Sequence, residues 1–343
     1  MNIRKTQAAE IREFILRNIA SREKDIVSIT AEKFAVTRQS VLRHLQKLAK
    51  ENLITIKGTA RAKTYELKPI VDFTQQFPLT KDLKEDTLWR QHIRPHLQEV
   101  AANVFEICHY GFAEMVNNAI DHSDGSNLSI MLKYSPALIE MHIADDGVGI
   151  FRKIQTEFHL DDPIDTILEL AKGKLTTDPE HHSGEGIFFT SRLFDDFAIR
   201  SGKLLFAHRD NKDWLLEDTE EPVKGTTIVL KISPLVERIA KEIFDLYSTE
   251  EEFSFLRTHI PVTLARYGDE NLISRSQAKR LLARFERFKE LILDFTGIAT
   301  IGPAFADEIF RVFANEHPDI HLTPLHANAE VMKMISRAKN AGN

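Results

Sequence analysis

The alternation of apolar and polar residues over residues 112–150 predicts a helix, then a hairpin, then a buried strand. The first part reads FAEMVNNAIDHS. In it Glu114, Asn118 and Asp121 recur at i, i+4 and i+7, so they share one face of a helix while apolar residues take the other. A carboxylate and a carboxamide one turn apart suit proton abstraction from a water and binding of a hard cation such as Mg²⁺.

A second pattern follows where the apolar run 141–144 predicts a strand that leads directly into two acidic residues and two glycines. Gly147 and Gly149 let the backbone turn sharply and bring a flat ligand close to it. Asp145, at the strand end, can accept a hydrogen bond from an exocyclic amine such as that of adenine. Taken alone, this pattern and the preceding helix are each more typical of an ordinary turn and a solvated helix face.

Two further glycine elements come later in the chain and change that interpretation. Gly184 and Gly186 precede a predicted helix at 189–194, where backbone N–H groups could hold phosphates. Thr226 follows Gly225 and opens the predicted apolar strand 228–232.

This ordered set resembles the GHKL ATP-binding superfamily, which includes gyrase, mismatch-repair ATPases, histidine kinases and bacterial anti-sigma-factor kinases. The resemblance covers about residues 80–233 and implies a two-layer α/β sandwich that binds ATP and Mg²⁺. It assigns Glu114 as general base and Asn118 as the magnesium ligand. The implied ATP-binding residues are Asn118, Asp145, Gly147, Gly149, Ile150, Lys174, Gly184, Gly186 and Thr226.

The long polar stretch 151–183 lies where GHKL proteins keep their ATP lid, and a short helix is predicted at 162–171. Lys174 is a candidate contact to the γ-phosphate, although a lysine in such a loop is more often simply solvated. Histidine kinases generally carry asparagine where this chain has Glu114. The site therefore resembles that of an ATPase or an anti-sigma-type serine kinase more closely.

Charge distinguishes the first 70 residues from the rest of the chain. They hold 15 lysine and arginine residues against 7 acidic ones, a local charge of +8, whereas the whole chain of 343 residues carries −6. A basic head on an acidic body indicates an anionic partner for the head. The length suggests two or three domains.

The pattern of the basic head predicts helices at 4–19, 31–34 and 38–52, followed by a hairpin over 53–67. The third helix begins with TRQSVLRHL, and Leu42 is among the residues expected to face inward. The segment resembles the winged helix-turn-helix domains of bacterial transcription regulators.

A winged helix of this kind would place its third helix in the major groove and its hairpin near phosphates. The alternative is a protein-docking module, because winged helices also serve that purpose. The candidate DNA-binding residues are Arg38, Gln39, Arg43, Lys47, Lys57, Arg61 and Lys63.

Between the two domains the sequence predicts a linker at 71–85 and then a helix at 85–102. After the ATP-binding region it predicts a connecting helix at 236–257.

The C-terminal pattern predicts strands at 262–265 and 291–295, with helices at 274–288, 303–315 and 329–339. Residues 258–343 therefore form a small α/β domain. The segment LILDFTGIATIGPAFADEIF resembles the STAS-like domains found behind GHKL ATPases. Where anti-sigma antagonists of that family carry a phosphorylatable serine, this chain has Pro303 and Ala304, which have no hydroxyl.

Together these patterns predict a multidomain α/β and α+β protein: a winged helix, a GHKL sandwich and a STAS-like domain. The first functional hypothesis is a bacterial regulator in which ATP binding or hydrolysis controls DNA binding by the head. The alternatives are an anti-sigma-type serine/threonine kinase acting on a separate protein, and a pseudo-ATPase scaffold. Expected partners are ATP, duplex DNA, a protein at the STAS-like domain and, with nucleotide bound, a second copy of the chain.

Localisation follows from two sequence features. No apolar run is long enough to span a bilayer, and Met-Asn-Ile-Arg-Lys at the start lacks a signal-peptide apolar region. We therefore expect a cytoplasmic protein without membrane contact. One cysteine excludes an intramolecular disulfide.

Overall fold

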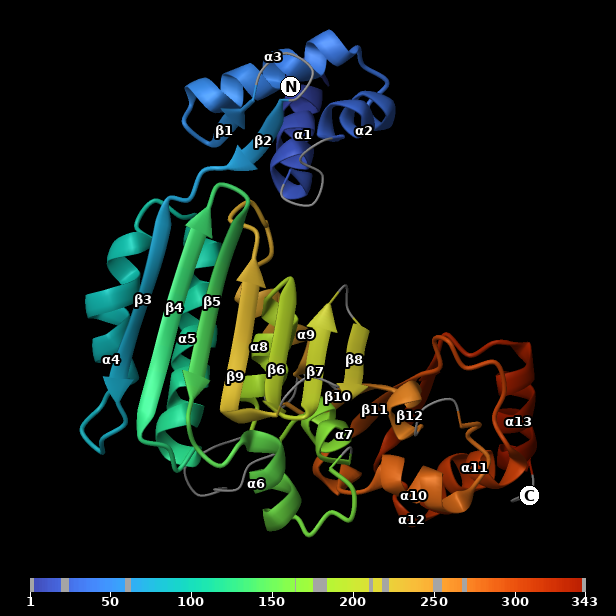
Figure 1. The fold of residues 1–343 in the computed structure, drawn as a ribbon. Coiled ribbons are helices and arrows are strands. Elements are labelled where there is room, and N and C mark those ends of the chain that lie inside the picture. The colour runs from blue at the N-terminus through green and yellow to red at the C-terminus, as the bar shows by residue number, and fades with distance from the viewer. Residues whose placement is uncertain are drawn as a thin grey trace.

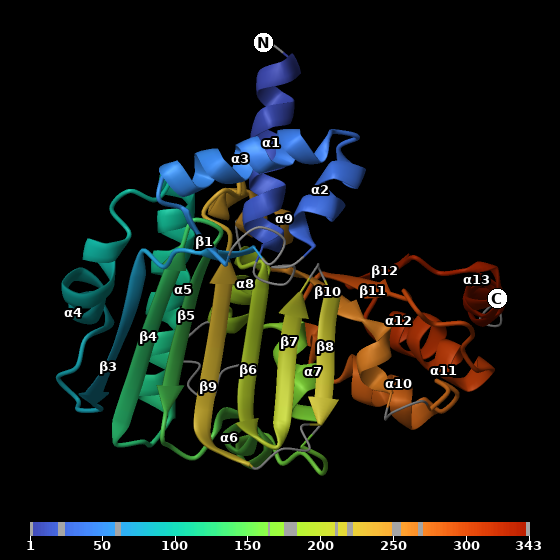
Figure 2. The same ribbon diagram turned by 45° about the horizontal axis from the view of Figure 1, so that its top comes forward.

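The computed structural model describes residues 3–19, 25–58, 63–163, 165–174, 184–209, 212–217, 222–248, 255–266 and 270–340. Within these ranges three separate sheets form, each with its own helices (Figure 1). The N-terminal helices lie beyond one end of the large central sheet, and the C-terminal part lies beside its β8 edge (Figures 1 and 2). This mixed architecture is compatible with the multidomain α/β and α+β class that the sequence predicts.

The N-terminal part consists of three helices and an antiparallel hairpin, in the predicted order. Thr37 caps the third helix by accepting a bond from the Ser40 amide at 3.2 Å. The second helix begins earlier than expected because Ile26 and Val27 are buried. Leu42 is 37% exposed, so the prediction that it faces inward is wrong. The elements are α1 (Ile3–Asn18), α2 (Ile26–Lys33), α3 (Arg38–Lys50), β1 (Ile54–Lys57) and β2 (Thr64–Leu67).

The central sheet has seven strands in the order β3-β4-β5-β9-β6-β7-β8, and every neighbouring pair is antiparallel. β9, the last of these strands along the chain, therefore lies between β5 and β6, which residues 146–195 separate in sequence. The strands are β3 (Val71–Pro78), β4 (Asn127–Ser135), β5 (Leu138–Asp145), β6 (Asp196–Gly202), β7 (Leu204–Arg209), β8 (Lys212–Glu217) and β9 (Val223–Ile232).

Helices cover one face of this sheet and make it a two-layer unit (Figure 1). Strand β4 has the alternation that such an arrangement requires, with Leu128, Ile130 and Leu132 buried and the intervening residues half-buried or exposed. The covering helices include α4 (Glu85–Leu88), α5 (Ala102–His122), α8 (Gly186–Leu193) and α9 (Ala240–Tyr247).

Two predictions for the segment 71–102, which includes the β3 edge of this sheet, are wrong. The expected linker at 71–85 contains β3, which pairs along its whole length with β4 and forms an edge of the sheet. The expected helix at 85–102 continues α4 only through a π-helical turn, Trp89–Ile93, and a 3₁₀ turn, Arg94–His96. Pro95 explains the interruption, because proline removes a helical hydrogen-bond donor and clashes with the preceding turn.

The C-terminal part has three parallel strands in the order β10-β11-β12. Residues 262–265 form a 3₁₀ turn rather than the expected strand, because the strand β10 ends just before them, at Pro261. Of the expected helix 236–257, only α9 is helical among the described residues. The elements are β10 (Arg257–Pro261), α10 (Arg275–Leu282), β11 (Glu290–Asp294), α11 (Pro303–Asp307), α12 (Ala314–Glu316), β12 (His321–Leu325) and α13 (Ala329–Asn340).

The central and C-terminal parts share one continuous hydrophobic core. Phe255 lies at the junction, with its ring centroid 4.5 Å from that of Phe188 and 5.1 Å from that of Phe189, both on α8. Two short helices, α6 (Ile150–Glu157) and α7 (Asp165–Lys172), complete this region. The C-terminal part is therefore packed against the helix that the second glycine element opens.

Candidate nucleotide site

Asp145 ends β5, and the neighbouring strand β9 brings Thr226 beside it. The Gly147 amide donates to Asp145 Oδ1 at 2.9 Å, and the Thr226 amide donates to the same oxygen at 3.3 Å. Burial raises the pKa of Asp145, and these two backbone hydrogen bonds partly oppose that effect. The Asp145 carboxylate is therefore held in one orientation and is partly desolvated, so a hydrogen bond donated by a ligand would stabilise its charge.

Gly147 and Gly225 lie against Asp145, and Gly149 lies against Gly225. A Cβ on Gly147 would lie 1.9 Å from the Ser123 carbonyl oxygen, and one on Gly225 would lie 2.0 Å from the Asp145 carbonyl oxygen. Gly149 has φ +88° and opens α6. The sequence suggested ligand approach as the reason for Gly147 and Gly149, whereas close contacts within the protein already require small residues here.

Ile150 and Thr226 belong to the same cluster. The Ile150 amide donates to Thr226 Oγ1 at 2.9 Å, which ties the start of α6 to β9. Ser201, on β6, donates to the Gly225 carbonyl at 2.7 Å. Residues expected to bind ATP therefore converge from β5, α6 and β9.

Glu114 and Asn118 lie one turn apart on α5, and both are half-buried. Helix α5 packs on α8, and a Cβ on Gly186 would lie only 2.0 Å from Glu114 Oε2. Glu114 therefore lies directly against the glycine that opens α8. Burial raises the pKa of the Tyr110 hydroxyl, and the charges of Glu114 and Glu185 raise it further.

Gly184 has φ +73°, a conformation that side chains other than glycine adopt at a cost. It lies two residues before the start of α8. The predicted lid residues 175–183 lie outside the described residues. The structure thus describes the second glycine element from Gly184 onward but not the chain that leads into it.

Lys174 is turned toward the C-terminal part. Its ammonium lies 5.7 Å from the ring centroid of Phe255 and 5.3 Å from that of Phe288, and it donates to the Arg287 carbonyl at 3.3 Å. Contact with a γ-phosphate would require this side chain to leave these partners. The predicted phosphate role of Lys174 stays a prediction.

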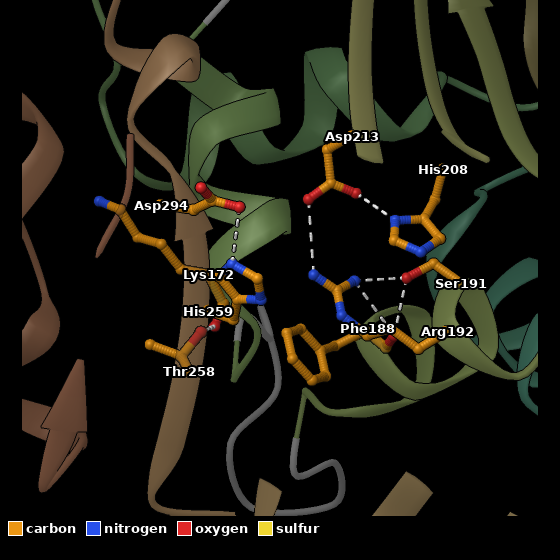
Figure 3. A network of polar contacts seen from close by, with 9 residues as sticks. All are labelled: Lys172, Phe188, Ser191, Arg192, His208, Asp213, Thr258, His259 and Asp294. Carbon is orange, nitrogen blue, oxygen red and sulfur yellow. Dashed lines mark hydrogen bonds and ion pairs between the residues drawn. The ribbon is translucent and has the colours of Figure 1, made fainter. Parts of the chain in front are cut away.

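Two groups of polar contacts, which the sequence did not suggest, lie at the junction between α8 and the C-terminal strands (Figure 3). Arg192, on α8, lies 3.5 Å from Asp213 Oδ2, and His208 Nδ1 lies 2.6 Å from Asp213 Oδ1. His259, on β10, contacts Asp294 Oδ2 at 3.2 Å. Burial lowers the pKa of His259, and the charge of Asp294 opposes that shift.

The outer face of α3 carries the charges that the sequence predicts. Arg38, Gln39, Arg43 and Lys47 are all exposed. On the hairpin, Lys63 is also exposed, Lys57 pairs with Glu66 at 2.6 Å, and Arg61 lies outside the described residues.

The comparisons with known proteins bear on the C-terminal part. A family model described as a STAS-like domain of unknown function (DUF4325) matches residues 277–332. This match supports the predicted STAS-like character of that segment, from α10 to α13. No curated protein matches the chain.

Features for crossing a membrane and for holding a metal ion are both missing from the described ranges. No helix there combines the length and apolar character needed to cross a bilayer. Those residues also contain no group of three or more histidine, cysteine and acidic side chains arranged to hold a metal ion.

Proposed function

We propose that the central domain is a GHKL-type ATP-binding domain and that its nucleotide state controls a winged-helix head that binds DNA. The observation that carries this proposal is the convergence of Asp145, Gly147 and Thr226 at one end of the sheet. A fixed, partly desolvated carboxylate beside close-packed glycines suits an adenine ring and its exocyclic amine. The seven-stranded antiparallel sheet with helices on one face also suits this assignment.

The phosphate end supports hydrolysis as well as binding. Glu114 lies against Gly186, so a phosphate held at the start of α8 would lie within reach of its carboxylate. Glu114 would then take the proton of an attacking water, and Asn118, one turn further along, would hold Mg²⁺. When bound, Mg²⁺ neutralises phosphate charge and orients the phosphates.

The test of the nucleotide proposal is a calorimetric titration of the full-length protein with ATP and GTP, each with Mg²⁺. We expect GTP to bind at least about tenfold more weakly, because guanine presents a carbonyl oxygen where adenine donates to Asp145, and a lost charged hydrogen bond costs about this much. Equal affinities would contradict adenine recognition by Asp145. No heat with either nucleotide would contradict the ATP site altogether.

Kinase activity is the alternative, because the same site could transfer phosphate to a protein hydroxyl. Pro303 and Ala304 lack a hydroxyl at the position where STAS antagonists carry serine, so the substrate would be a separate protein. Incubation with γ-labelled ATP, with and without cell extract, separates released phosphate from labelled protein.

The DNA proposal is supported by the exposed basic residues of α3 and by the local charge of +8. Arg12 and Arg17, on α1, provide matched controls, because each already pairs with a carboxylate, Glu51 and Glu13 respectively. Both control arginines lie outside the predicted reading helix.

We expect Arg38→Ala combined with Arg43→Ala to weaken duplex binding more than Arg12→Ala combined with Arg17→Ala. If the two α3 arginines contact phosphates, their loss should reduce the salt slope of log affinity by about 2. Gel shifts across a salt series, with and without a non-hydrolysable ATP analogue, provide the measurement. No shift at low salt would leave the head as a protein-docking module.

The same series also tests nucleotide control. GHKL domains often pair with a second copy when ATP orders the lid, so we expect the analogue to favour a two-headed dimer that binds duplex more tightly. Sedimentation of the protein with and without the analogue measures that change directly. If the sedimenting mass is the same with and without the analogue, nucleotide does not drive dimerisation, and DNA binding does not depend on it.

A further inference from the structure

The polar face of helix α7 contacts the C-terminal domain. Asp165, Glu169 and Lys172 recur at i, i+4 and i+7, so they form one stripe along the helix. Asp165 Oδ1 pairs with Arg280 Nε at 3.3 Å, and Glu169 Oε2 pairs with Arg284 at 3.2 Å. All three side chains of the stripe meet the end of α10 or the turn that follows it.

Lys172 makes the most demanding of these contacts. Its side chain is 2% exposed, and its ammonium donates to Glu169 Oε1 at 2.6 Å and to the Ala283 carbonyl at 2.8 Å. It therefore places a cation at the C-terminal end of α10, where the helix dipole is negative. The Phe285 ring lies 5.0 Å from the same ammonium. A buried charge is tolerated only when it is paired. Separation of α7 from α10 would therefore require water to replace the contact between the Lys172 ammonium and the Ala283 carbonyl.

The chain that follows α7 is fixed to the same domain. Thr258 Oγ1 donates to the Lys172 carbonyl at 2.7 Å. Arg287 donates to the Lys174 carbonyl at 2.7 Å, and the Lys174 ammonium donates to the Arg287 carbonyl. Gly173 has φ +79°, and a Cβ there would lie 2.6 Å from the Phe255 ring. Residues 172–174 are thus held through both backbone and side chains.

We propose that the C-terminal domain is an autoinhibitory latch on the lid of the ATP site. It holds α7 and keeps Lys174 on its own surface, so Lys174 reaches a nucleotide phosphate only when the latch opens. This inference rests on the proposed ATP-binding function. It assigns the STAS-like domain a role within the chain: whatever pulls that domain from α7 speeds turnover, and by linkage ATP weakens the hold of the domain on α7.

The position of the latch supports this coupling. Helix α7 precedes the phosphate glycines and α8 follows them, and both helices contact the C-terminal domain. On the α8 side, Phe188 stacks near Phe255, and Arg192 and Asp213 lie close enough to His259 to influence its pKa (Figure 3). A movement of the C-terminal domain would therefore shift the helices on both sides of the glycine element that contains Gly184 and Gly186.

The test is a charge swap between Asp165 and Arg280. The pair is only partly buried, with side chains 17% and 20% exposed, so the variants should fold. Asp165→Arg and Arg280→Asp each place like charges together, whereas the double variant restores opposite charges. Arg275→Asp is the matched control, because Arg275 pairs with Asp307 within the C-terminal domain.

Two measurements on the full-length variants decide the outcome. Hydrogen exchange without nucleotide should be faster in α7 for both single variants and should return to the wild-type rate in the double variant. ATP turnover should rise on the order of fivefold in the single variants, the lower end of typical coupling between sites, and return in the double variant. Arg275→Asp should change neither quantity.

Arg287→Ala provides a second route, because it removes the side-chain hydrogen bond that holds the Lys174 backbone carbonyl and places no charge inside the junction. It should also raise turnover. If hydrogen exchange in α7 is unchanged in the single variants, the contact does not act as a latch. If exchange is faster but ATP turnover is unchanged or lower, the contact is not autoinhibitory. If the wild type binds no ATP in calorimetry, the proposed function fails first, and the exchange data still judge the contact itself.

Discussion

Replacing Glu114 with alanine is expected to leave ATP binding intact while turnover falls by about 10²–10⁴-fold, the usual contribution of a positioned general base. The carboxylate lies against Gly186 at the start of α8, where the γ-phosphate and its attacking water would lie. Adenine recognition at Asp145 involves other elements, so affinity should change little. Calorimetry for binding and phosphate release for turnover measure the two effects separately.

Glu106→Ala is the matched control for this experiment. Glu106 lies two turns earlier on α5 and is exposed, so its loss should leave turnover unchanged. Normal turnover in Glu114→Ala would show that another residue is the base. A wild type that releases and transfers no phosphate under any condition would favour the pseudo-ATPase interpretation.

Replacing Asp145 with alanine is expected to abolish measurable ATP binding. The change removes the proposed acceptor for the adenine amine and also leaves the Gly147 and Thr226 amides without their described acceptor. Leaving buried donors unpaired adds to the loss of the ligand contact. Calorimetry on the folded variant, with its thermal unfolding checked first, provides the measurement.

Asp146 gives a contrast within the same turn. The Asn127 side-chain amide donates to Asp146 Oδ2 at 3.0 Å, and the Ser126 and Asn127 backbone amides donate to Asp146 Oδ1 at 2.7 and 2.9 Å. These bonds lower the pKa of Asp146 to about 2. Asp146→Ala should therefore reduce thermal stability while nucleotide affinity is largely kept. Unchanged affinity in Asp145→Ala would refute the assignment of Asp145, and equal loss in both variants would point to a general collapse of the turn.

Local sequence patterns determined most of the elements, because each depends on residues close together in the chain. Glu114 and Asn118 share a helix face through the helical period alone, and Asp145 ends a strand that alternation already marks. The third helix of the head begins at its Thr37 cap, as its sequence suggests. The element order of the C-terminal part was also readable, and the family match supports its STAS-like character.

Tertiary structure determined which segments, distant in sequence, contact each other. The stretch that contains β3 reads as a linker because its polar residues lie on an exposed edge, and only pairing with β4 makes it a strand. Lys172 looks like a surface lysine at the end of a short helix. It is buried because α10, more than a hundred residues later in the chain, places its carbonyl groups around the ammonium. Long-range packing of this kind leaves no periodic signal, so the sequence indicated the candidate site but not the contact between α7 and α10.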